Sequence, residues 1–184
     1  AKGLSGATIS IRPHKDSSII SQENTIAGNT VLYGATSGEL YIAGQAGERF
    51  AVRNSGAITV VEGCGSNGCE YMTGGTVVIL GEVGDNFAAG MTGGMAFIYD
   101  RNKEFEKKVN PESVVWQNLE TDYWKNFLKS LVIEHVNETG SDLSKQIIEN
   151  FDEELNNFVQ VCPKEMLDKL SNPISLKSNI KEVS

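Results

Sequence analysis

Three glycines in the middle of the chain have the spacing of a cofactor-binding motif. Gly63, Gly65 and Gly68 follow the β-rich run AITVV as G-x-G-x-x-G, and Glu82 lies near the distance at which an acidic residue holds a ribose in dinucleotide-binding proteins. That fingerprint needs a helix that begins at the third glycine, because the free N–H groups of the helix bind the pyrophosphate. Here CEYMTGG leads directly into another strand-like run. We therefore interpret the glycines as a turn and not as a nucleotide site.

The three cysteines could hold a metal or react as thiols. Cys64 and Cys69 have four residues between them, and neither a second pair nor a nearby histidine completes a four-ligand set. With Cys162 the count is odd, which does not indicate a disulfide framework and favours a reducing compartment. We interpret Cys64 and Cys69 as small buried residues at turns.

The titratable side chains show no recognisable catalytic arrangement. Neither His14 nor His135 has a matching nucleophile or carboxylate pattern around it, so we expect a surface or packing role for each. A second set of charged residues recurs at the edges of strand-like runs and could supply active-site groups, although ion pairs at a surface or at a domain interface are the simpler interpretation. This set is Glu48, Arg49, Arg53, Glu62 and Glu70.

Methionine and aromatic side chains are the remaining candidates for a binding surface. Met72, Met91 and Met95 lie close to glycine pairs, where they could form an adaptable partner surface or fill a core. The aromatic set Trp116, Tyr123, Trp124 and Phe127 reads as the apolar face of a helical region. We predict no catalytic, cofactor-binding or metal-binding residue in this chain.

The element that carries most of these residues is an internal repeat. All but one of the 19 glycines lie before Asp100, and five segments superimpose on anchor positions spaced by 31, 18, 19 and 19 residues. The anchors are Ala7, Gly38, Gly56, Gly75 and Gly94. Two residues before each anchor stands a small polar residue, suited to satisfying turn backbone: Ser5, Thr36, Asn54, Thr73 and Thr92.

Apolar residues alternate after every anchor, which predicts five strands that each bury one face in the same register. The buried positions are Ile9, Ile11, Leu40, Ile42, Ile58, Val60, Val77, Ile79, Ala96 and Ile98. A repeat of 18 or 19 residues is too short for a strand–helix–strand unit but suits one coil of a parallel β-helix. The longer first interval places an excursion at residues 12–18, which have loop composition.

Beyond Asp100 the apolar period changes from 2 to 3.6. Residues 124–136 predict an amphipathic helix that Gly140 ends, and residues 143–155 predict a second helix with Ser141 as its N-cap. Asn110-Pro111-Glu112 reads as another helix start, and Pro163 opens a short last turn. We expect the helices to cap or flank the coils, and residues 171–184 to be loosely held.

Composition limits the classes of partner. The chain has 184 residues with 40% hydrophobic content, which is enough for a real core. Sixteen basic and 24 acidic residues give a net charge of -8, so nucleic acid and anionic membrane are poor candidates as partners. We expect a fragment of a longer protein, located in the cytoplasm or, in a photosynthetic eukaryote, in the plastid stroma.

These motifs resemble one family closely. The run GNTVLYGATSGELYIAGQAGERFAVRNSGAITVVEGCGSNGCEYMTGGTVVILGEVGDNFAAGMTGGMAFIYD is similar to the C-terminal glycine-repeat (GXGXG) domain of the glutamate synthase large subunit. The segments FEKKVNPESV, HVNETGS and NFVQVCPKEML resemble the end of the same subunit, so the likeness runs from Gly3 to about Leu167. The tail from Ser171 onward matches nothing in that family.

The resemblance implies a right-handed parallel β-helix, which agrees with the fold class reached from spacing: mainly β, a single-stranded solenoid with a C-terminal helical extension. We place the solenoid in residues 1–100 and a helical cap and tail in residues 101–184. The family's domain has further coils before residue 1 of this chain. Its glutaminase nucleophile, FMN site and iron–sulfur cysteines belong to other domains, so Cys64, Cys69 and Cys162 inherit no cluster role.

The resemblance also implies a function. The parent enzyme moves the amide nitrogen of glutamine onto 2-oxoglutarate, giving two glutamates, and this domain would be a non-catalytic part that positions the glutaminase and FMN domains. The expected partners are those domains and, as one alternative, the small subunit or ferredoxin, for which this chain would be a docking surface. A second alternative is an independent binding or catalytic module. The electron donor, NADPH, NADH or ferredoxin, is chosen outside this chain.

Overall fold

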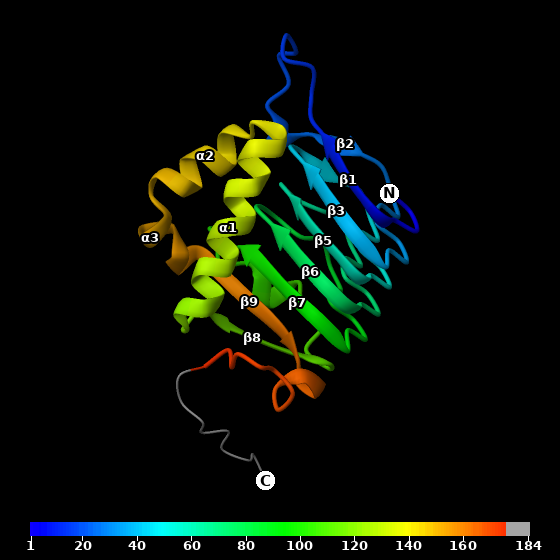
Figure 1. The fold of residues 1–184 in the computed structure, drawn as a ribbon, viewed down its shortest axis with the longest axis vertical. Helices are drawn as coiled ribbons and strands as arrows, with labels where there is room; N and C mark the ends of the chain where they lie inside the picture. The colour runs from blue at the N-terminus through cyan, green and yellow to red at the C-terminus, as the bar shows by residue number, and fades with distance from the viewer. Residues whose placement is uncertain (176–184) are drawn as a thin grey trace.

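The computed structural model describes residues 1–175 and shows a parallel β-solenoid of about four turns, with helices that come from the C-terminal part of the chain (Figure 1). One sheet of seven strands runs through it in the order β1-β3-β5-β6-β7-β9-β8. Its strands are β1 (Ser5–Ile11), β3 (Ser37–Ile42), β5 (Ser55–Val61), β6 (Thr73–Ile79), β7 (Gly93–Tyr99), β8 (Val114–Asn118) and β9 (Phe158–Pro163). The first five of these are mutually parallel, as the repeat predicts.

A second, shorter line of strands forms another side of the solenoid. β2 (Thr25–Ala27) pairs with β4 (Gln45–Ala46), and single bridges continue this line from Ala46 to Cys64 and from Cys64 to Val83. Successive coils therefore hydrogen-bond on two sides, which is how a solenoid stack satisfies its backbone.

The third side of the solenoid uses left-handed backbone that the glycine pattern does not reveal. Each coil has three residues with φ between 53° and 65° at alternate positions. The trios are Thr30, Leu32 and Gly34; Arg49, Ala51 and Arg53; Asn67, Cys69 and Tyr71; Asn86, Ala88 and Gly90. The middle residue of each trio is fully buried, and hydrogen bonds between coils, such as Ala51 N to Val31 O at 2.9 Å, hold this geometry against its conformational cost.

The register of β5 differs from the sequence-based alignment by one residue. Thr59 pairs with Leu40 on β3 and with Val77 on β6, so Ala57, and not Gly56, stands at the level of the other anchors. A slip of one residue moves a side chain to the opposite face of a sheet. The prediction that Ile58 and Val60 face the solenoid interior is therefore wrong, and both pack on the helix side.

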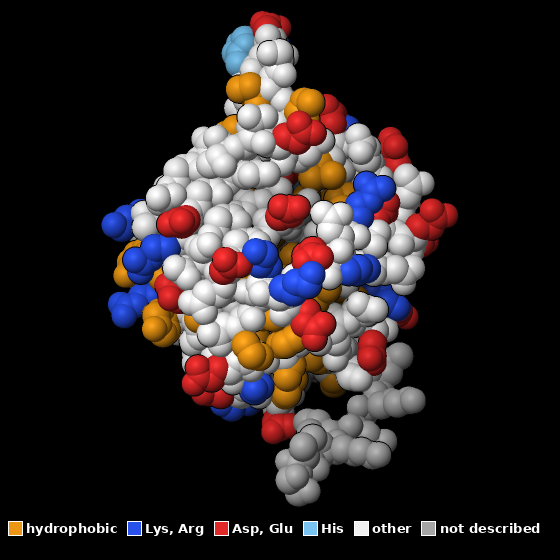
Figure 2. All heavy atoms as spheres, turned by 180° about the vertical axis from the view of Figure 1, so that it is seen from behind, with side chains coloured by type: hydrophobic (Ala, Val, Ile, Leu, Met, Phe, Trp, Pro, Cys, Tyr) orange, Lys and Arg blue, Asp and Glu red, His pale blue; other side chains and the backbone are white. Residues whose placement is uncertain are grey.

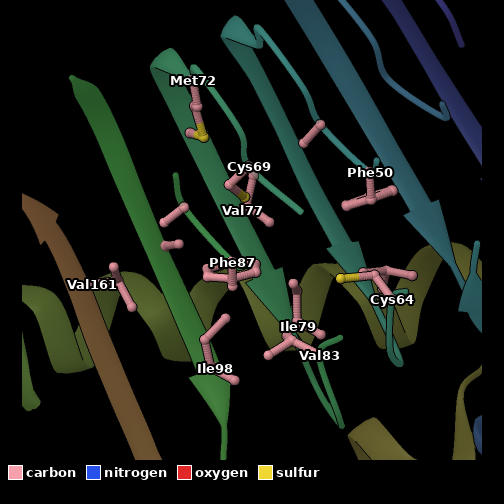
Figure 3. Close-up of a cluster of buried hydrophobic side chains, with 14 of the residues drawn as sticks. Phe50, Cys64, Cys69, Met72, Val77, Ile79, Val83, Phe87, Ile98 and Val161 are labelled. Carbon is pink, nitrogen blue, oxygen red and sulfur yellow. The ribbon is translucent and has the colours of Figure 1, made fainter. Parts of the chain in front are cut away.

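Two apolar clusters lie on the two faces of the main sheet. The interior cluster fills the solenoid, and its centre is drawn in Figure 3; it includes Leu40, Ile42, Phe50, Val61, Val77, Ile79, Phe87, Ala96 and Ile98. The helix-side cluster includes Tyr41, Val60, Val78, Phe97, Trp124, Leu128, Val132 and Phe158. Strands with both faces covered read as continuous apolar runs, as AITVV and TVVIL do.

The helices lie across the outer face of the sheet (Figure 1). They are α1 (Asp122–Thr139), α2 (Asp142–Glu149) and α3 (Phe151–Glu154), with 3-10 turns η1 (Ser21–Glu23), η2 (Phe105–Lys107), η3 (Leu155–Asn157) and η4 (Lys164–Met166). As predicted, Gly140 ends α1 at φ 70°, the Ser141 hydroxyl caps α2 by accepting from Ser144 N, and Pro163 precedes η4. The predicted second helix over residues 143–155 is divided at Asn150 into α2 and α3, and its last residue belongs to η3. Within residues 1–175, no helix combines the length and the apolar character that crossing a membrane requires.

The predicted helix start at Asn110-Pro111-Glu112 is wrong, because this segment leads into β8. The Asn110 side chain accepts a hydrogen bond from Glu112 N at 3.1 Å, which closes a turn. A bond from a backbone N–H to a nearby asparagine side chain also occurs at helix N-caps, so the sequence pattern is the same in both structures. β9 then inserts between β7 and β8, antiparallel to both, so strands close this end of the stack while the helices flank it. The boundary at residue 100 stays a prediction, although β8 and β9 complete a sheet that begins in the first part.

Two peripheral segments complete the description. The predicted excursion at residues 12–18 is an extended loop that projects beyond the sheet (Figure 1). Residues 171–175 are held more firmly than expected, since Ile174 is buried and its carbonyl accepts from Gln117 Nε2 at 2.7 Å. The rest of the predicted loose tail, residues 176–184, lies outside the described residues.

Candidate binding cavity at the carboxyl edge of the sheet

The G-x-G-x-x-G segment forms a turn in the solenoid, and no helix follows Gly68. Each glycine lets neighbouring coils approach. A side chain at Gly65 would meet the backbone N of Glu48 at 2.9 Å, and one at Gly68 would meet the Cys64 sulfur and the Phe87 ring at 3.0 Å. The spacing therefore reflects close packing between coils.

The three cysteines are buried thiols on two different faces of the sheet. Cys64 and Cys69 belong to the interior cluster (Figure 3), and Cys162 belongs to the helix-side cluster. Burial raises the pKa of Cys64 to about 12 and that of Cys162 to about 11, and it raises the pKa of Cys69 well above its ordinary value. Thiols with such pKa values stay protonated at neutral pH, which disfavours metal ligation and nucleophilic chemistry.

The two histidines lie in opposite environments. His14 is exposed in the projecting loop, with its Nδ1 3.6 Å from an Asp16 carboxylate oxygen. His135 is fully buried on α1, where its Nδ1 lies 2.8 Å from the Ser144 hydroxyl, and burial lowers its pKa to about 4. In residues 1–175 no group of three or more His, Cys, Asp or Glu side chains could hold a metal ion.

Four of the five charged residues at coil edges lie at the surface. Glu70 forms an ion pair with Arg49, whose guanidinium lies 3.9 Å from its carboxylate, while Glu48 and Arg53 are exposed. Figure 2 shows acidic and basic side chains interspersed over the rear face of the molecule. Such a mixed surface provides no field of one sign to attract a large charged partner.

The methionines and most of the aromatic residues fill the core. Met72 and Met91 lie in the interior cluster and Met95 in the helix-side cluster, all three buried. Trp124 and Phe127 pack around Phe97 from α1, and Tyr123 is about half exposed beside them. Trp116 is the exception to the predicted helical face, because it lies on β8 and packs against the interior cluster.

Glu62 is the one coil-edge charge that is buried. It follows the last residue of β5 and is only 1% exposed. The Ser141 hydroxyl donates a hydrogen bond to Glu62 Oε1, whereas Oε2 has no hydrogen-bond partner among residues 1–175. Burial raises the pKa of Glu62, and the nearby Asp142 carboxylate raises it further. The Ser141 hydroxyl acts in the opposite direction, as does the Ser21 hydroxyl, which lies near Glu62 without hydrogen-bond geometry to Oε2.

A cavity of about 550 Å³ opens beside Glu62, where β5, β6 and β7 end. Its volume is in the range of small-molecule sites. Apolar side chains from the strand ends and α2 form part of the wall, and the remainder is polar. Glu62 and Glu82 lie 20 residues apart in the sequence, and both line this cavity.

The repeat motif and its surroundings match known proteins. Residues 1–164 match the model of the GXGXG motif family. The chain is 59% identical over 179 residues to the large chain of the NADPH glutamate synthase of Azospirillum brasilense, covering 97% of this chain and 12% of that protein. It is 48% identical to the NADH glutamate synthase of Schizosaccharomyces pombe, over 99% of this chain and 9% of that protein.

A third relative uses a different electron donor according to its name. The chain is 47% identical to ferredoxin-dependent glutamate synthase 2 of Synechocystis, over 88% of this chain and 10% of that protein. The chain thus spans about a tenth of the length of the relatives that it matches. It belongs to the GXGXG motif family, in the form that glutamate synthase large chains carry.

Proposed function

We propose that this chain is a structural domain of glutamate synthase that holds the glutaminase and FMN domains in a fixed relative position. The observation that carries the proposal is the construction of the solenoid. Coil-to-coil hydrogen bonds run along its sides, buried clusters cover both faces of the main sheet, and β8 and β9 close one end. Such a stack resists bending, so domains attached to it keep their separation.

A fixed separation matters for the reaction proposed for the parent enzyme. Ammonia released from glutamine must reach 2-oxoglutarate before it escapes to solvent, and a displacement of about 1 Å in a catalytic arrangement can cost 100-fold in rate. The partners of this domain are accordingly the other domains of the same large chain. Whether the small subunit or ferredoxin also contacts it is a separate hypothesis.

The FMN and iron–sulfur cofactors of the parent enzyme belong, in this proposal, to those other domains. The cysteines here do not fit an iron–sulfur cluster, which takes four thiolate ligands in its common forms. There are three, all buried with raised pKa values, and they lie on two faces of the sheet.

A coupling measurement in the large chain tests the positioning role. Gly94→Val disturbs the solenoid at a left-handed position, whereas Gly28→Ala is a matched control with open space around the added carbon. We expect Gly94→Val to preserve glutamine hydrolysis but to release free ammonia, so that glutamate formed per glutamine consumed falls from two toward one. Full coupling in a Gly94→Val enzyme whose solenoid is shown to be loosened by hydrogen exchange would overturn the proposal.

A further inference from the structure

The length over which relatives align with this chain differs with the electron donor in their names. Three relatives named for NADPH or NADH, from Azospirillum brasilense, Schizosaccharomyces pombe and Bacillus subtilis, align over 179, 182 and 172 residues. Four relatives named as ferredoxin-dependent, from Synechocystis, Arabidopsis thaliana, Spinacia oleracea and Pyropia yezoensis, each align over 162 residues. Among these seven proteins, a donor-specific stretch of 10 to 20 residues is therefore shared with the first group alone.

The donor-specific stretch fits the part of the chain that follows the family motif. The GXGXG motif ends at residue 164, so 20 of the 184 residues come after it, and each ferredoxin-dependent alignment omits 22 residues. The alignment with the S. pombe protein omits only two residues, so it extends at least to residue 182. The expectation that the tail from Ser171 onward matches nothing in the family is therefore wrong for this relative. The agreement in number points to the segment after residue 164 as the donor-specific stretch.

The described part of this segment, residues 165–175, is anchored mainly by its backbone (orange and red in Figure 1). The Asn172 carbonyl accepts from Trp124 Nε1 at 3.1 Å, and the Ile174 carbonyl accepts from Gln117 Nε2 at 2.7 Å. The Ile174 side chain is buried in the helix-side cluster. Because these contacts hold the chain in place, exposed side chains such as Ser171 stand on a fixed backbone and can serve another purpose.

Tyr123 lies next to this segment and is 49% exposed. Its ring is T-shaped against Trp124, with ring centres 4.9 Å apart, and is stacked with Phe127 at 6.4 Å. A tyrosine that neighbouring rings already hold loses little side-chain entropy on binding, and tyrosine is enriched among the residues that contribute most to protein interfaces. Trp124 also donates to Asn172, so Tyr123 and the anchored segment form one continuous surface.

Charge does not single out a partner for this surface. Residues 120–125 and 164–175 hold three basic and four acidic side chains in total. Such a mixture gives no field of one sign, so a partner would bind here through packing and hydrogen bonds.

We propose that Tyr123 and residues 165–175 form a docking surface for the partner subunit that oxidises NADPH or NADH and passes the electrons to the large chain. Two of the relatives named for NADPH are called large chains, a name that distinguishes them from a smaller chain. A subunit that only nucleotide-dependent enzymes use needs a surface that ferredoxin-dependent enzymes lack, and the donor-specific stretch has this distribution. The docking surface goes beyond the positioning role, although both rest on a glutamate synthase parent.

The affinity of the full large chain for its nucleotide-oxidising subunit tests the docking surface. Tyr123→Glu and Ser171→Arg change exposed side chains and leave the backbone anchors in place. Ile133→Glu is the matched control, because Ile133 is 40% exposed on the same helix and lies ten residues, or about 15 Å, from Tyr123. We expect Kd to rise at least about tenfold in the two variants and to stay within about twofold in the control.

Two electron sources separate docking from damage to the large chain itself. NADPH or NADH acts through the partner subunit, whereas reduced methyl viologen supplies electrons to the large chain directly. At a limiting concentration of the subunit, we expect Tyr123→Glu and Ser171→Arg to form glutamate more slowly with the nucleotide and at the wild-type rate with reduced methyl viologen.

An unchanged Kd in both variants would overturn the docking surface, and so would an equal rise of Kd in Ile133→Glu. A wild-type enzyme that takes electrons faster from reduced ferredoxin than from NADPH or NADH would overturn the choice of partner.

This test is separate from the coupling measurement. Retained coupling in Gly94→Val together with a raised Kd in Tyr123→Glu would refute the positioning role and leave the docking surface standing. Lost coupling in Gly94→Val with an unchanged Kd in Tyr123→Glu and Ser171→Arg would do the opposite.

Discussion

His135 provides the most direct test of the packing between α1 and the sheet. Its ring is fully buried, 2.8 Å from the Ser144 hydroxyl and 6.2 Å from the Tyr41 ring centre, and burial lowers its pKa to about 4 from an ordinary value of 6.5. In the unfolded chain His135 binds a proton as the pH falls below about 6.5, whereas in the folded chain it stays neutral until about pH 4.

The sign and size of the effect follow from that difference. Between pH 6.5 and 4 the unfolded state binds more protons, so the free energy of unfolding decreases as the pH falls. A pKa of about 4 in the folded chain against 6.5 in the unfolded chain corresponds to a loss of roughly 3.5 kcal/mol, at about 1.4 kcal/mol per pKa unit. The full contribution is present above pH 6.5 and is gone below pH 4.

Urea denaturation of the wild type and of His135→Gln, at several pH values between about 7 and 4.5, measures this contribution. Glutamine does not titrate, so the difference in unfolding free energy between the two proteins should shrink by about 2–3 kcal/mol over this range. His14→Gln is the control for the substitution itself, because His14 is exposed, and it should change the unfolding free energy at pH 7 by less than about 0.5 kcal/mol. Parallel curves for the wild type and His135→Gln would refute the buried, neutral histidine.

Three further substitutions test the solenoid and the Glu62 contact by thermal or urea denaturation. Gly94→Val should lower the free energy of unfolding by about 2 kcal/mol or more, since φ is +81° and an added carbon would lie 2.7 Å from a carbonyl oxygen of the neighbouring coil. Gly28→Ala should be nearly neutral, and equal stabilities of the two variants would contradict the corner geometry. Ser141→Ala should lower the free energy of unfolding by about 2–4 kcal/mol, because it removes both the N-cap of α2 and the donor to Glu62. Ser130→Ala, at an exposed position, should cost less than about 0.5 kcal/mol, and similar losses in the two variants would argue against the Ser141–Glu62 contact. The raised pKa of Glu62 means that the folded state holds its proton longer, so this group's contribution to stability decreases as the pH rises above about 4.5, and Glu62→Gln should be more stable than the wild type at pH 8 but not at pH 4.

The candidate cavity could not be found from sequence, although its residues could be named. Glu62 occurs at a coil edge like Glu48 and Glu70, and no local signal separates the three. What buries Glu62 is the N-terminus of α2, whose Ser141 lies 79 residues further along the chain. The expectation of an ion pair holds for Glu70, which pairs with Arg49 at the surface, whereas Glu62 is buried and forms no ion pair within residues 1–175, because its burial depends on a contact far away in sequence.

The β5 error has a more local cause. The repeat pattern predicts Gly56 as the anchor of this coil, but the strand ladder aligns Ala57 with Gly38 and Gly75. The Asn54 side chain brackets Ala57 with hydrogen bonds to its N and O at 2.9 Å, so this coil makes its corner without a left-handed glycine at that level. Alternation alone could not reveal the slip, because AITVV is apolar on both faces.

The sequence by itself determined the elements whose signals are local and repeated. The coil spacing near 19 residues and the alternation after each anchor specify the parallel strands β1 to β7 of the main sheet, and the 3.6 period with Gly140 and Ser141 specifies α1 and α2. The tertiary structure alone decided the placement of β9 between β7 and β8, the left-handed trios and the burial of Glu62. Each of these depends on hydrogen bonds or packing between segments distant in sequence, whose energies outweigh local preference only once the coils have stacked.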